Sequence, residues 1–432
     1  MSRRALSRIL VPPGPPGVGL VAGALSRALS GGQPFAPIPL ASQTTPAAHA
    51  AAMSAAVEAS APLKRDDIAI VLATSGSTGE PRGVVLTSSA LTASAQLGSA
   101  AMGPPGVWLT AMPVTGIGGL LTVARALLAG GEPMAWPGVG GAEPFTAKSF
   151  TSTARSVLDR ARADGLPAYV SLVPTQVTRL LGDPAALDAL AGFGRVIVGG
   201  ARLARHSRAA ATAAGVRIVE TYGMTETCGG VVYDGKPLPG VLVDVCADTG
   251  VVRLGGPTIA VGYRLRPDLD RRRFANGWFI TSDLGRWDGE TLTVLGRCDD
   301  VIKVGGVKVS LPAVTEAVRS DSRVIDALTV AAQDPEWGAV PTTYVVPDDA
   351  SATRPGVLAD ALTVELIGIV TSRLGRASAP RRIEFVAELP HLPSGKAGIL
   401  PHPAGGTLPH FVGGPPTKWG RGHPGPPADS QT

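Results

Sequence analysis

The sequence is poor in cysteine, in aromatic side chains and in long apolar runs. Its three cysteines, Cys228, Cys246 and Cys298, form no CxxC pair and cannot make an even disulfide framework. We therefore expect free thiols in a reducing compartment. The six histidines are isolated, without the spacing of a zinc site. These absences argue against a disulfide-rich secreted domain and against a zinc module.

No run of about 18 apolar residues is present, so the sequence predicts no transmembrane helix. Residues 1–25 have a basic start and an apolar stretch, which superficially resemble a signal peptide. Their proline-rich middle and the lack of a clean small-residue cleavage site speak against that interpretation. We expect a cytoplasmic protein.

Charge of either sign is also sparse. The 432 residues carry 39 Lys and Arg against 34 Asp and Glu, a net charge of +5, and the basic residues are scattered. This balance favours anionic small molecules over nucleic acid as partners, and no basic-aromatic module is visible. With 44% hydrophobic but 4% aromatic residues, the chain can build a large core from Ala, Val and Leu and more than one domain.

The most informative stretch is residues 71–86, VLATSGSTGEPRGVVL. An apolar β-branched run breaks into glycines and hydroxyls and then resumes, which predicts strand, loop and strand. Glycines let backbone N–H groups converge on one point, and hydroxyls and a guanidinium can bind the oxygens of a polyphosphate. The stretch is not a Walker A loop, because no Gly-Lys-Ser/Thr ends it. The predicted phosphate ligands are Thr74, Ser75, Gly76, Ser77, Thr78, Gly79 and Arg82.

Strand and helix patterns alternate between residues 168 and 220. The expected strands are 168–173, 196–199 and 217–220, and the expected helices are 176–181 and 206–214. Such alternation predicts a parallel sheet covered by helices, with ligands at the carboxyl ends of the strands. Gly199, Gly200 and Ala201 follow one such end and are assigned to nucleotide binding. Alanine-rich helices are also expected over 17–30 and 47–62, and a helix capped by one of the hydroxyl residues 87–89.

The loop at 74–83 resembles the phosphate loop of the adenylate-forming ligases, which include acyl- and aryl-CoA synthetases, luciferases and adenylation domains. Residues 220–226, ETYGMTE, match the second signature of this family. The resemblance implies that Tyr222 packs on adenine, with Gly223 and Met224 beside it. It also implies that Thr225 contacts the α-phosphate and that Glu226 holds Mg²⁺. A carboxylate suits that role, since Mg²⁺ prefers oxygen ligands beside phosphate.

Two further stretches match the family. Residues 277–285 and 296–300 imply that Asp283 binds the ribose hydroxyls, with Arg297 close by and Asp299 as the hinge between two domains. Residues 392–396, LPSGK, imply that Lys396 is the adenylation lysine. Its ammonium would stabilise charge as the transition state forms. In the relatives, a hairpin like 301–309 faces the site for thioester formation, so Lys303, Gly305 and Gly306 are assigned to CoA.

Residues 169–181, YVSLVPTQVTRLL, resemble the substrate-side helix of the o-succinylbenzoate–CoA ligases, the menaquinone-pathway branch of the family. The resemblance implies that Thr175, Gln176 and Arg179 bind an aromatic acid with a second polar end. Thr115 stands in a loop where related ligases often carry a gating histidine. The chain also departs from the family at Arg82, where lysine is usual, and the guanidinium is a planar fork rather than a point charge.

We therefore expect an α/β fold: a large N-terminal domain of mixed and parallel sheets with covering helices (1–298), a small α+β lid (299–400) and a disordered Gly/Pro-rich tail (401–432). The expected reaction is ATP-dependent ligation of o-succinylbenzoate to CoA through an acyl-AMP, with Mg²⁺. One alternative is a ligase for another aryl or medium-chain acid. Another is a non-catalytic nucleotide-binding relative. A homodimer is expected by analogy alone.

Overall fold

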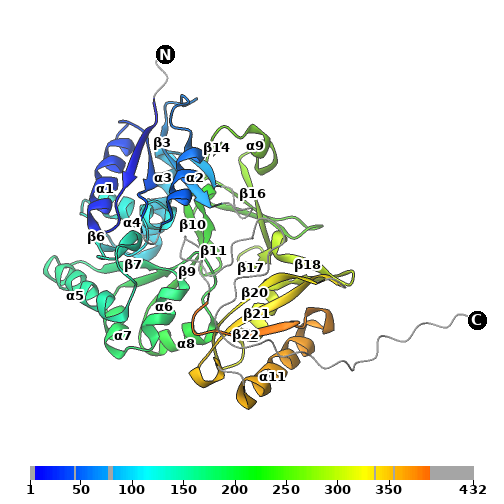
Figure 1. Cartoon of the computed structure of the whole chain (residues 1–432). Helices are drawn as coiled ribbons and strands as arrows, with labels where there is room; N and C mark the ends of the chain where they lie inside the picture. The colour runs from blue at the N-terminus through cyan, green and yellow to red at the C-terminus, as the bar shows by residue number, and fades with distance from the viewer. Residues whose placement is uncertain (1–4, 43–44, 76–80, 335–336, 354–355, 390–432) are drawn as a thin grey trace, which may run out of the picture.

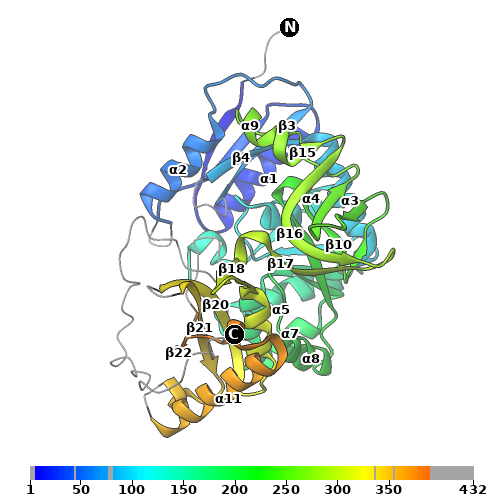
Figure 2. The same cartoon turned by 90° about the vertical axis from the view of Figure 1, so that its right-hand side faces the viewer.

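A computed structural model describes residues 5–42, 45–75, 81–334, 337–353 and 356–389. The N-terminal part contains three sheets with covering helices, and the C-terminal part is a smaller α+β unit packed against it (Figures 1 and 2). The predicted fold class is confirmed. The boundary predicted at residue 298 falls between the last strand of the third sheet and the first strand of the fourth.

The first sheet carries the predicted strand, loop and strand. Its strands are β1 (Ser7–Val11), β2 (Phe35–Pro39), β3 (Ile68–Ser75), β4 (Pro81–Thr87) and β14 (Gly262–Tyr263), in that order. β3 and β4 are antiparallel, with Thr74 opposite Arg82. The apolar residues of β3 are almost completely buried, which explains why a β-branched run was a reliable signal here.

Two alanine-rich helices cover this sheet, α1 (Pro15–Leu29) and α2 (Ala47–Val57). The predicted second helix, 47–62, is too long. It ends because Glu58 adopts a left-handed φ of 44° and because Arg264 donates hydrogen bonds to the carbonyls of Val57, Glu58, Ala61 and Pro62. Arg264 therefore satisfies carbonyls that a helix end leaves without partners.

The second sheet is the predicted parallel sheet. Its order is β11-β10-β9-β8-β7-β5-β6, and β9, β8, β7, β5 and β6 run parallel. These strands are β5 (Val107–Thr110), β6 (Met134–Ala135), β7 (Ala168–Leu172), β8 (Arg195–Val198), β9 (Ile218–Met224), β10 (Gly229–Tyr233) and β11 (Lys236–Pro237).

Helices surround this sheet (Figure 1). They are α3 (Ser88–Met102), α4 (Ile117–Leu128), α5 (Ala147–Ala163), α6 (Pro174–Leu181), α7 (Pro184–Ala191) and α8 (Arg205–Ala213). The predicted capping of α3 is confirmed, because the Thr87 hydroxyl accepts from the Ala90 N–H at 3.1 Å.

The third sheet is antiparallel and reaches toward the C-terminal part. It contains β12 (Leu242–Val245), β13 (Val251–Gly255), β16 (Trp278–Trp287) and β15 (Phe274–Ala275), with β17 (Leu292–Arg297) paired to β16. The short helix α9 (Pro267–Arg273) directly precedes β15. Asp283 lies inside β16 opposite Arg297 of β17, not in a hairpin turn.

The C-terminal part has its own apolar core, formed by residues between Val304 and Val370. Its strands are β18 (Val301–Val304), β19 (Val307–Ser310), β20 (Val324–Asp334), β21 (Gly338–Pro347) and β22 (Arg382–Phe385), and its helices are α10 (Leu311–Arg319) and α11 (Val357–Leu374). The predicted hairpin at 301–309 is confirmed as β18 and β19.

All three cysteines are free thiols, as predicted. Burial raises the pKa of the Cys228 thiol well above its usual range, which keeps it protonated and unreactive. In the part of the chain that the structure describes, no helix is long and apolar enough to cross a membrane.

Candidate active site

The second signature lies at the carboxyl end of the parallel sheet. The sequence predicted a strand over 217–220 followed by a loop, but β9 continues to Met224. The reason is β10, which turns back and pairs antiparallel with β9, placing Tyr222 opposite Val232. Thr225 and Glu226 then form a single 3₁₀ turn, η2 (Thr225–Thr227), between the two strands. The turn projects Glu226 from the end of the sheet.

This turn requires glycine on both sides. A Cβ on Gly223 would lie 2.0 Å from the carbonyl oxygen of Gly229, and a Cβ on Gly229 would lie 2.3 Å from Leu121 Cδ1. Gly229 also has a φ of 93°, a conformation that favours glycine. The start of α4 is thus held against the turn that carries Glu226.

Gly223→Ala should lower the free energy of unfolding by about 1–3 kcal/mol, because the new methyl group meets backbone rather than a movable side chain. Thermal unfolding measures the change. The matched control is Gly19→Ala in α1, where a Cβ would have no heavy atom within 4 Å. We expect that variant to be as stable as the parent or slightly more stable, since alanine favours helix. Equal stability of the two variants would contradict this packing account.

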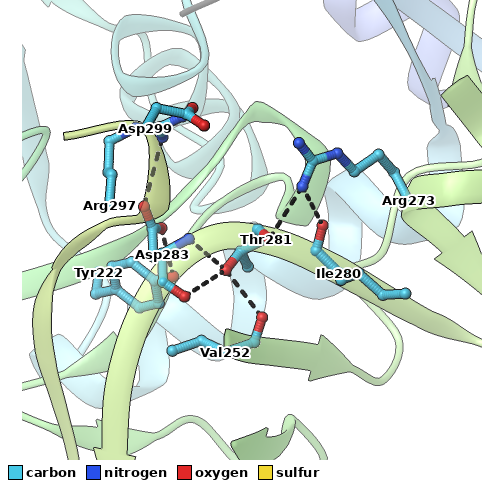
Figure 3. A network of polar contacts seen from close by, with 8 residues as sticks. All are labelled: Tyr222, Val252, Arg273, Ile280, Thr281, Asp283, Arg297 and Asp299. Atoms are coloured by element: carbon cyan, nitrogen blue, oxygen red, sulfur yellow. Dashed lines mark hydrogen bonds and ion pairs between the residues drawn. The ribbon is translucent and has the colours of Figure 1, made fainter. Parts of the chain in front are cut away.

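A polar cluster joins β9 to the third sheet. The Tyr222 hydroxyl donates to Asp283 Oδ2 at 2.7 Å, and Arg297 Nη1 approaches Asp283 Oδ1 at 3.4 Å. Arg297 Nη2 also donates to Asp299 Oδ2 at 2.8 Å (Figure 3). The structure therefore brings together four residues from three separate stretches of the sequence, 220–226, 277–285 and 296–300. Each oxygen of the Asp283 carboxylate keeps a second lone pair, with which it can accept from a hydroxyl of a sugar.

Two residues that sequence reasoning missed hold Asp283 in place. The Thr281 hydroxyl donates to the carbonyl of Val252 at 2.8 Å and accepts from the Asp283 N–H at 2.9 Å. Arg273 Nη1 donates to the carbonyl oxygen of Thr281 at 3.0 Å (Figure 3). Thr281 is buried, so its hydroxyl fixes the course of β16 beside the carboxylate. A threonine two positions before the aspartate was the available signal.

A second polar cluster lies on the phosphate-loop side. The Tyr263 hydroxyl of β14 donates to Glu226 Oε1 at 2.8 Å, and the guanidinium carbon of Arg82 lies 5.8 Å from the centre of the Tyr263 ring. Arg82 is the second residue of β4, the strand that follows the phosphate loop, and stands opposite Thr74. The described ends of the phosphate loop and the signature glutamate therefore meet around Tyr263, another residue that sequence reasoning missed.

Burial sets the protonation of both tyrosines. It raises the pKa of Tyr222, and the neighbouring charge of Asp283 raises it further. Burial likewise raises the pKa of Tyr263, reinforced by the charge of Glu226. Both phenols therefore stay protonated at neutral pH and act as donors to their carboxylates. The two tyrosine hydroxyls thereby hold the carboxylates of Asp283 and Glu226 in fixed orientations.

The donor set fits Mg²⁺ delivered with a nucleotide better than a metal held by protein alone. Among the described residues there is no group of three or more His, Cys, Asp or Glu side chains that could hold a metal. Mg²⁺ usually binds through one or two carboxylates and substrate phosphates. Glu226, oriented by Tyr263 and next to the buried Thr225, can supply one such carboxylate.

The predicted Gly199–Ala201 segment follows β8 at the same edge of the sheet. A Cβ on Gly199 would lie 2.8 Å from the Thr221 hydroxyl of β9, and Gly200 has a φ of 86°. Glycine is thus needed at both positions for the chain to pass close to β9. Gly199 thus lies against Thr221 of β9, and Gly200 and Ala201 are exposed.

Three of the predicted acid ligands, Thr175, Gln176 and Arg179, lie in α6, and Thr115 lies in the loop before α4. Gln176 Oε1 accepts from the Val173 N–H at 3.0 Å, and its Nε2 reaches the carbonyl of Ala111 at 3.4 Å. Gln176 therefore caps its own helix. Thr115 precedes α4, and both it and Thr175 are half-buried. Arg179 behaves differently, since its guanidinium forms an ion pair with Glu388 of the C-terminal part.

The predicted hinge residue and the predicted CoA residues lie close together in sequence, at the start of the C-terminal part. Asp299 is exposed in the short turn η3 (Cys298–Asp300) between β17 and β18. Lys303, Gly305 and Gly306 are exposed in the β18–β19 hairpin. Both glycines have positive φ, 53° and 85°, as the tight turn requires. A Cβ on Gly305 would lie 2.8 Å from the Trp337 ring.

Several predicted residues lie outside the described residues: Gly76, Ser77, Thr78 and Gly79 of the phosphate loop, the adenylation lysine Lys396, and the tail 401–432. The Ser75 backbone ends β3. The predicted convergence of the phosphate loop and Lys396 on one phosphorus therefore stays a prediction.

Two sequence models match the chain. The AMP-binding enzyme model covers residues 32–263, and the model for the AMP-binding enzyme C-terminal domain covers residues 312–396. The first match includes Tyr222, Glu226 and Tyr263 but ends before Asp283 and Arg297, and the second includes most of the C-terminal core. The chain belongs to the AMP-binding enzyme family.

Individual proteins that are similar to this chain are named as CoA ligases. The chain is 39% identical over 337 residues to a probable 2-succinylbenzoate–CoA ligase of Mycobacterium tuberculosis, covering 77% of this chain and 82% of that protein. It is 30% identical to a sulfoacetate–CoA ligase of Cupriavidus necator, covering 81% and 70%. Among solved structures, the o-succinylbenzoate–CoA synthetase of Bacillus subtilis in complex with AMP matches with a TM-score of 0.70 at 21% identity, over 92% of this chain and 88% of that one. The structural match supports the fold.

Proposed function

We propose that this chain is an AMP-forming acid–thiol ligase that converts 2-succinylbenzoate, ATP and CoA into 2-succinylbenzoyl-CoA, AMP and pyrophosphate, a step of menaquinone biosynthesis. The observation that carries the proposal is the 39% identity to a relative named for this reaction, extending over 82% of its length. Among the polar contacts, the cluster of Tyr222, Asp283 and Arg297 supports it, because these side chains suit a ribose.

The first half-reaction joins the acid to the nucleotide. A carboxylate oxygen of the acid attacks the α-phosphorus of ATP, and the bond to the β-phosphate oxygen breaks to release pyrophosphate. Both reactants are anions, so the site must lower charge repulsion and align them. In the proposal Thr225 donates to the α-phosphate, and Thr74, Arg82 and the phosphate loop hold the leaving pyrophosphate. Lys396 stabilises the charge that develops between the acid carboxylate and the α-phosphate.

Mg²⁺ would supply charge neutralisation of the phosphate oxygens, and Glu226 is its proposed protein ligand. Tyr263 keeps the Glu226 carboxylate aimed at that position by donating to it. Asp283 accepts from the ribose hydroxyls, while Gly199–Ala201 and Tyr222–Met224 flank the base.

The second half-reaction transfers the acyl group. The CoA sulfur attacks the acyl carbon, the thiol proton is lost to solvent, and the carbon–oxygen bond to AMP breaks. Gly305 and Gly306 are proposed to let the pantetheine arm pass close to backbone, and the exposed Lys303 to meet CoA phosphates. Asp299 is the proposed pivot between the two steps. Thr115, Thr175 and Gln176 are proposed to line the acid pocket.

A panel of acids tests the function. We expect pyrophosphate release with 2-succinylbenzoate, and thioester only when CoA is added. If pyrophosphate is released with another benzoate, a medium-chain acid or sulfoacetate but not with 2-succinylbenzoate, the proposed substrate is wrong and the proposed ligase reaction stands. No acid-dependent release would favour the non-catalytic alternative. A homodimer and a cytoplasmic location belong to the same proposal by analogy, and light scattering of the purified protein tests the former.

A further inference from the structure

Among the described residues, two ion pairs link the N-terminal and C-terminal parts. Arg179 in α6 pairs with Glu388, which follows β22. Arg202, in the loop after β8, lies 3.7 Å from Glu316 of α10 and also donates to the carbonyl of Val294 at 2.6 Å. In Figure 1 the yellow and orange elements of the C-terminal part lie to the right of α6 and α8, with α11 lowest.

We propose that Arg179 is a positioning residue for the first half-reaction: it docks the C-terminal part, through Glu388, at the carboxyl edge of the parallel sheet. This inference rests on the proposed function. It assigns Arg179 a role other than the binding of the acid that its sequence motif implies.

The position of the pair supports this assignment. α6 begins directly after β7, and β7 ends beside β8 at the edge that carries Gly199 and Gly200. Glu388 follows β22, the last described strand, and Lys396 comes eight residues later in the sequence. The ion pair therefore fixes, next to the nucleotide side of the sheet, the point from which the chain leads to Lys396.

The same contact cannot serve both half-reactions. The hairpin with Lys303 and Gly305 and the strand that leads to Glu388 are different members of one sheet, since β18 and β22 both pair with β21. A rigid sheet cannot present both to one site, so the C-terminal part must turn about η3 between the steps. A rotation of the C-terminal part that is large enough to replace one of these two elements by the other at the site separates Arg179 from Glu388. The pair therefore belongs to one orientation, the one that serves Lys396.

Removing one charge of this exposed ion pair should have only a small effect on the rate, so the test reverses the charge of one partner instead. The Arg179 and Glu388 side chains are 41% and 60% exposed, and an exposed ion pair changes an equilibrium by less than about fivefold. Like charges placed together add repulsion to the lost attraction. We expect Arg179→Glu and Glu388→Arg each to slow acid-dependent pyrophosphate release about three- to tenfold, and the double variant to return to within about twofold of the parent.

The acid concentration at half-saturation should be unchanged, and so should the rate at which supplied acyl-adenylate and CoA form thioester. The matched control is Glu365→Arg, which breaks an exposed pair with Arg323 inside the C-terminal part and should leave both rates unchanged. Three results together would overturn the inference in favour of acid binding: Arg179→Glu raises the acid concentration at half-saturation, Glu388→Arg has no effect, and the double variant does not recover. Unchanged rates in both single variants would also overturn it.

Cross-linking tests the contact without relying on activity. In a Cys246→Ser, Cys298→Ser background, the R179C/E388C variant should be joined internally by a short bis-maleimide reagent, and the R160C/E388C variant should not. Cross-linked protein should still release pyrophosphate in a single turnover but form no thioester. If the parent releases pyrophosphate but the R179C/E388C variant does not cross-link, the docking contact alone is overturned. If the variant cross-links but the parent adenylates no acid, the proposed function is overturned and, with it, the positioning role.

Discussion

Lys396→Ala should lower acid-dependent pyrophosphate release by about 10²- to 10³-fold, the range expected when one preorganised charge or donor is removed from a transition state. The proposal gives the Lys396 ammonium contact with both the acid carboxylate and the α-phosphate as charge develops between them. Binding of ATP in the ground state should change much less, because the interaction strengthens only in the transition state. Release is measured with 2-succinylbenzoate and ATP under saturation.

Three comparisons sharpen this result. The second half-reaction, started from supplied acyl-adenylate and CoA, should keep its rate in Lys396→Ala, because Lys396 serves only the first step. Lys236→Ala is the matched control, since Lys236 is exposed and pairs with Glu290 away from the polar clusters. A Lys396→Ala protein that releases pyrophosphate at the parent rate would remove the lysine from the chemistry.

Asp283→Ala should raise the ATP concentration at half-saturation at least tenfold and also reduce stability. The substitution removes the proposed acceptor of the ribose hydroxyls. It also leaves the buried Tyr222 hydroxyl and one side of Arg297 without their acceptor. Leaving a buried donor unsatisfied costs about 1–3 kcal/mol, so thermal unfolding should report a loss in that range.

Two further variants separate these effects. Tyr222→Phe removes one donor and keeps the carboxylate, so stability should fall less than in Asp283→Ala and ATP should still bind. Asp244→Ala breaks an exposed pair with Arg253 in the same sheet and should change neither quantity. Unchanged ATP saturation in a folded Asp283→Ala protein would mean that the nucleotide sugar binds elsewhere.

Local signals explain what the sequence predicted well. The β-branched run before residue 74 became β3, and the strand patterns at 168–173 and 196–199 became β7 and β8, because these strands are almost entirely buried. Thr87 caps α3 through a contact three residues away. The structure also brings together Tyr222, Asp283 and Arg297, which motif resemblance assigned to nucleotide binding, although they come from three strands.

Long-range contacts explain what the sequence did not predict. Arg264 ends α2 by donating to carbonyls more than 200 residues earlier, so no local pattern shortened that helix. Tyr263 orients Glu226 across 37 residues and two sheets. Arg179 stands in a segment that resembles an acid-binding helix, yet its partner, Glu388, lies in the other part of the molecule. In each case the deciding partner is distant in sequence and carries no local signal.

The central claim is that an oxygen of the acid becomes bonded to the α-phosphorus of the nucleotide. The direct measurement uses 2-succinylbenzoate labelled with ¹⁸O in its carboxylates, together with ATP, Mg²⁺ and CoA, followed by mass spectrometry of the AMP. The account predicts one ¹⁸O in each AMP, because the thiol breaks the bond between the acyl carbon and the oxygen that came from the acid. Unlabelled AMP formed alongside the thioester would contradict it.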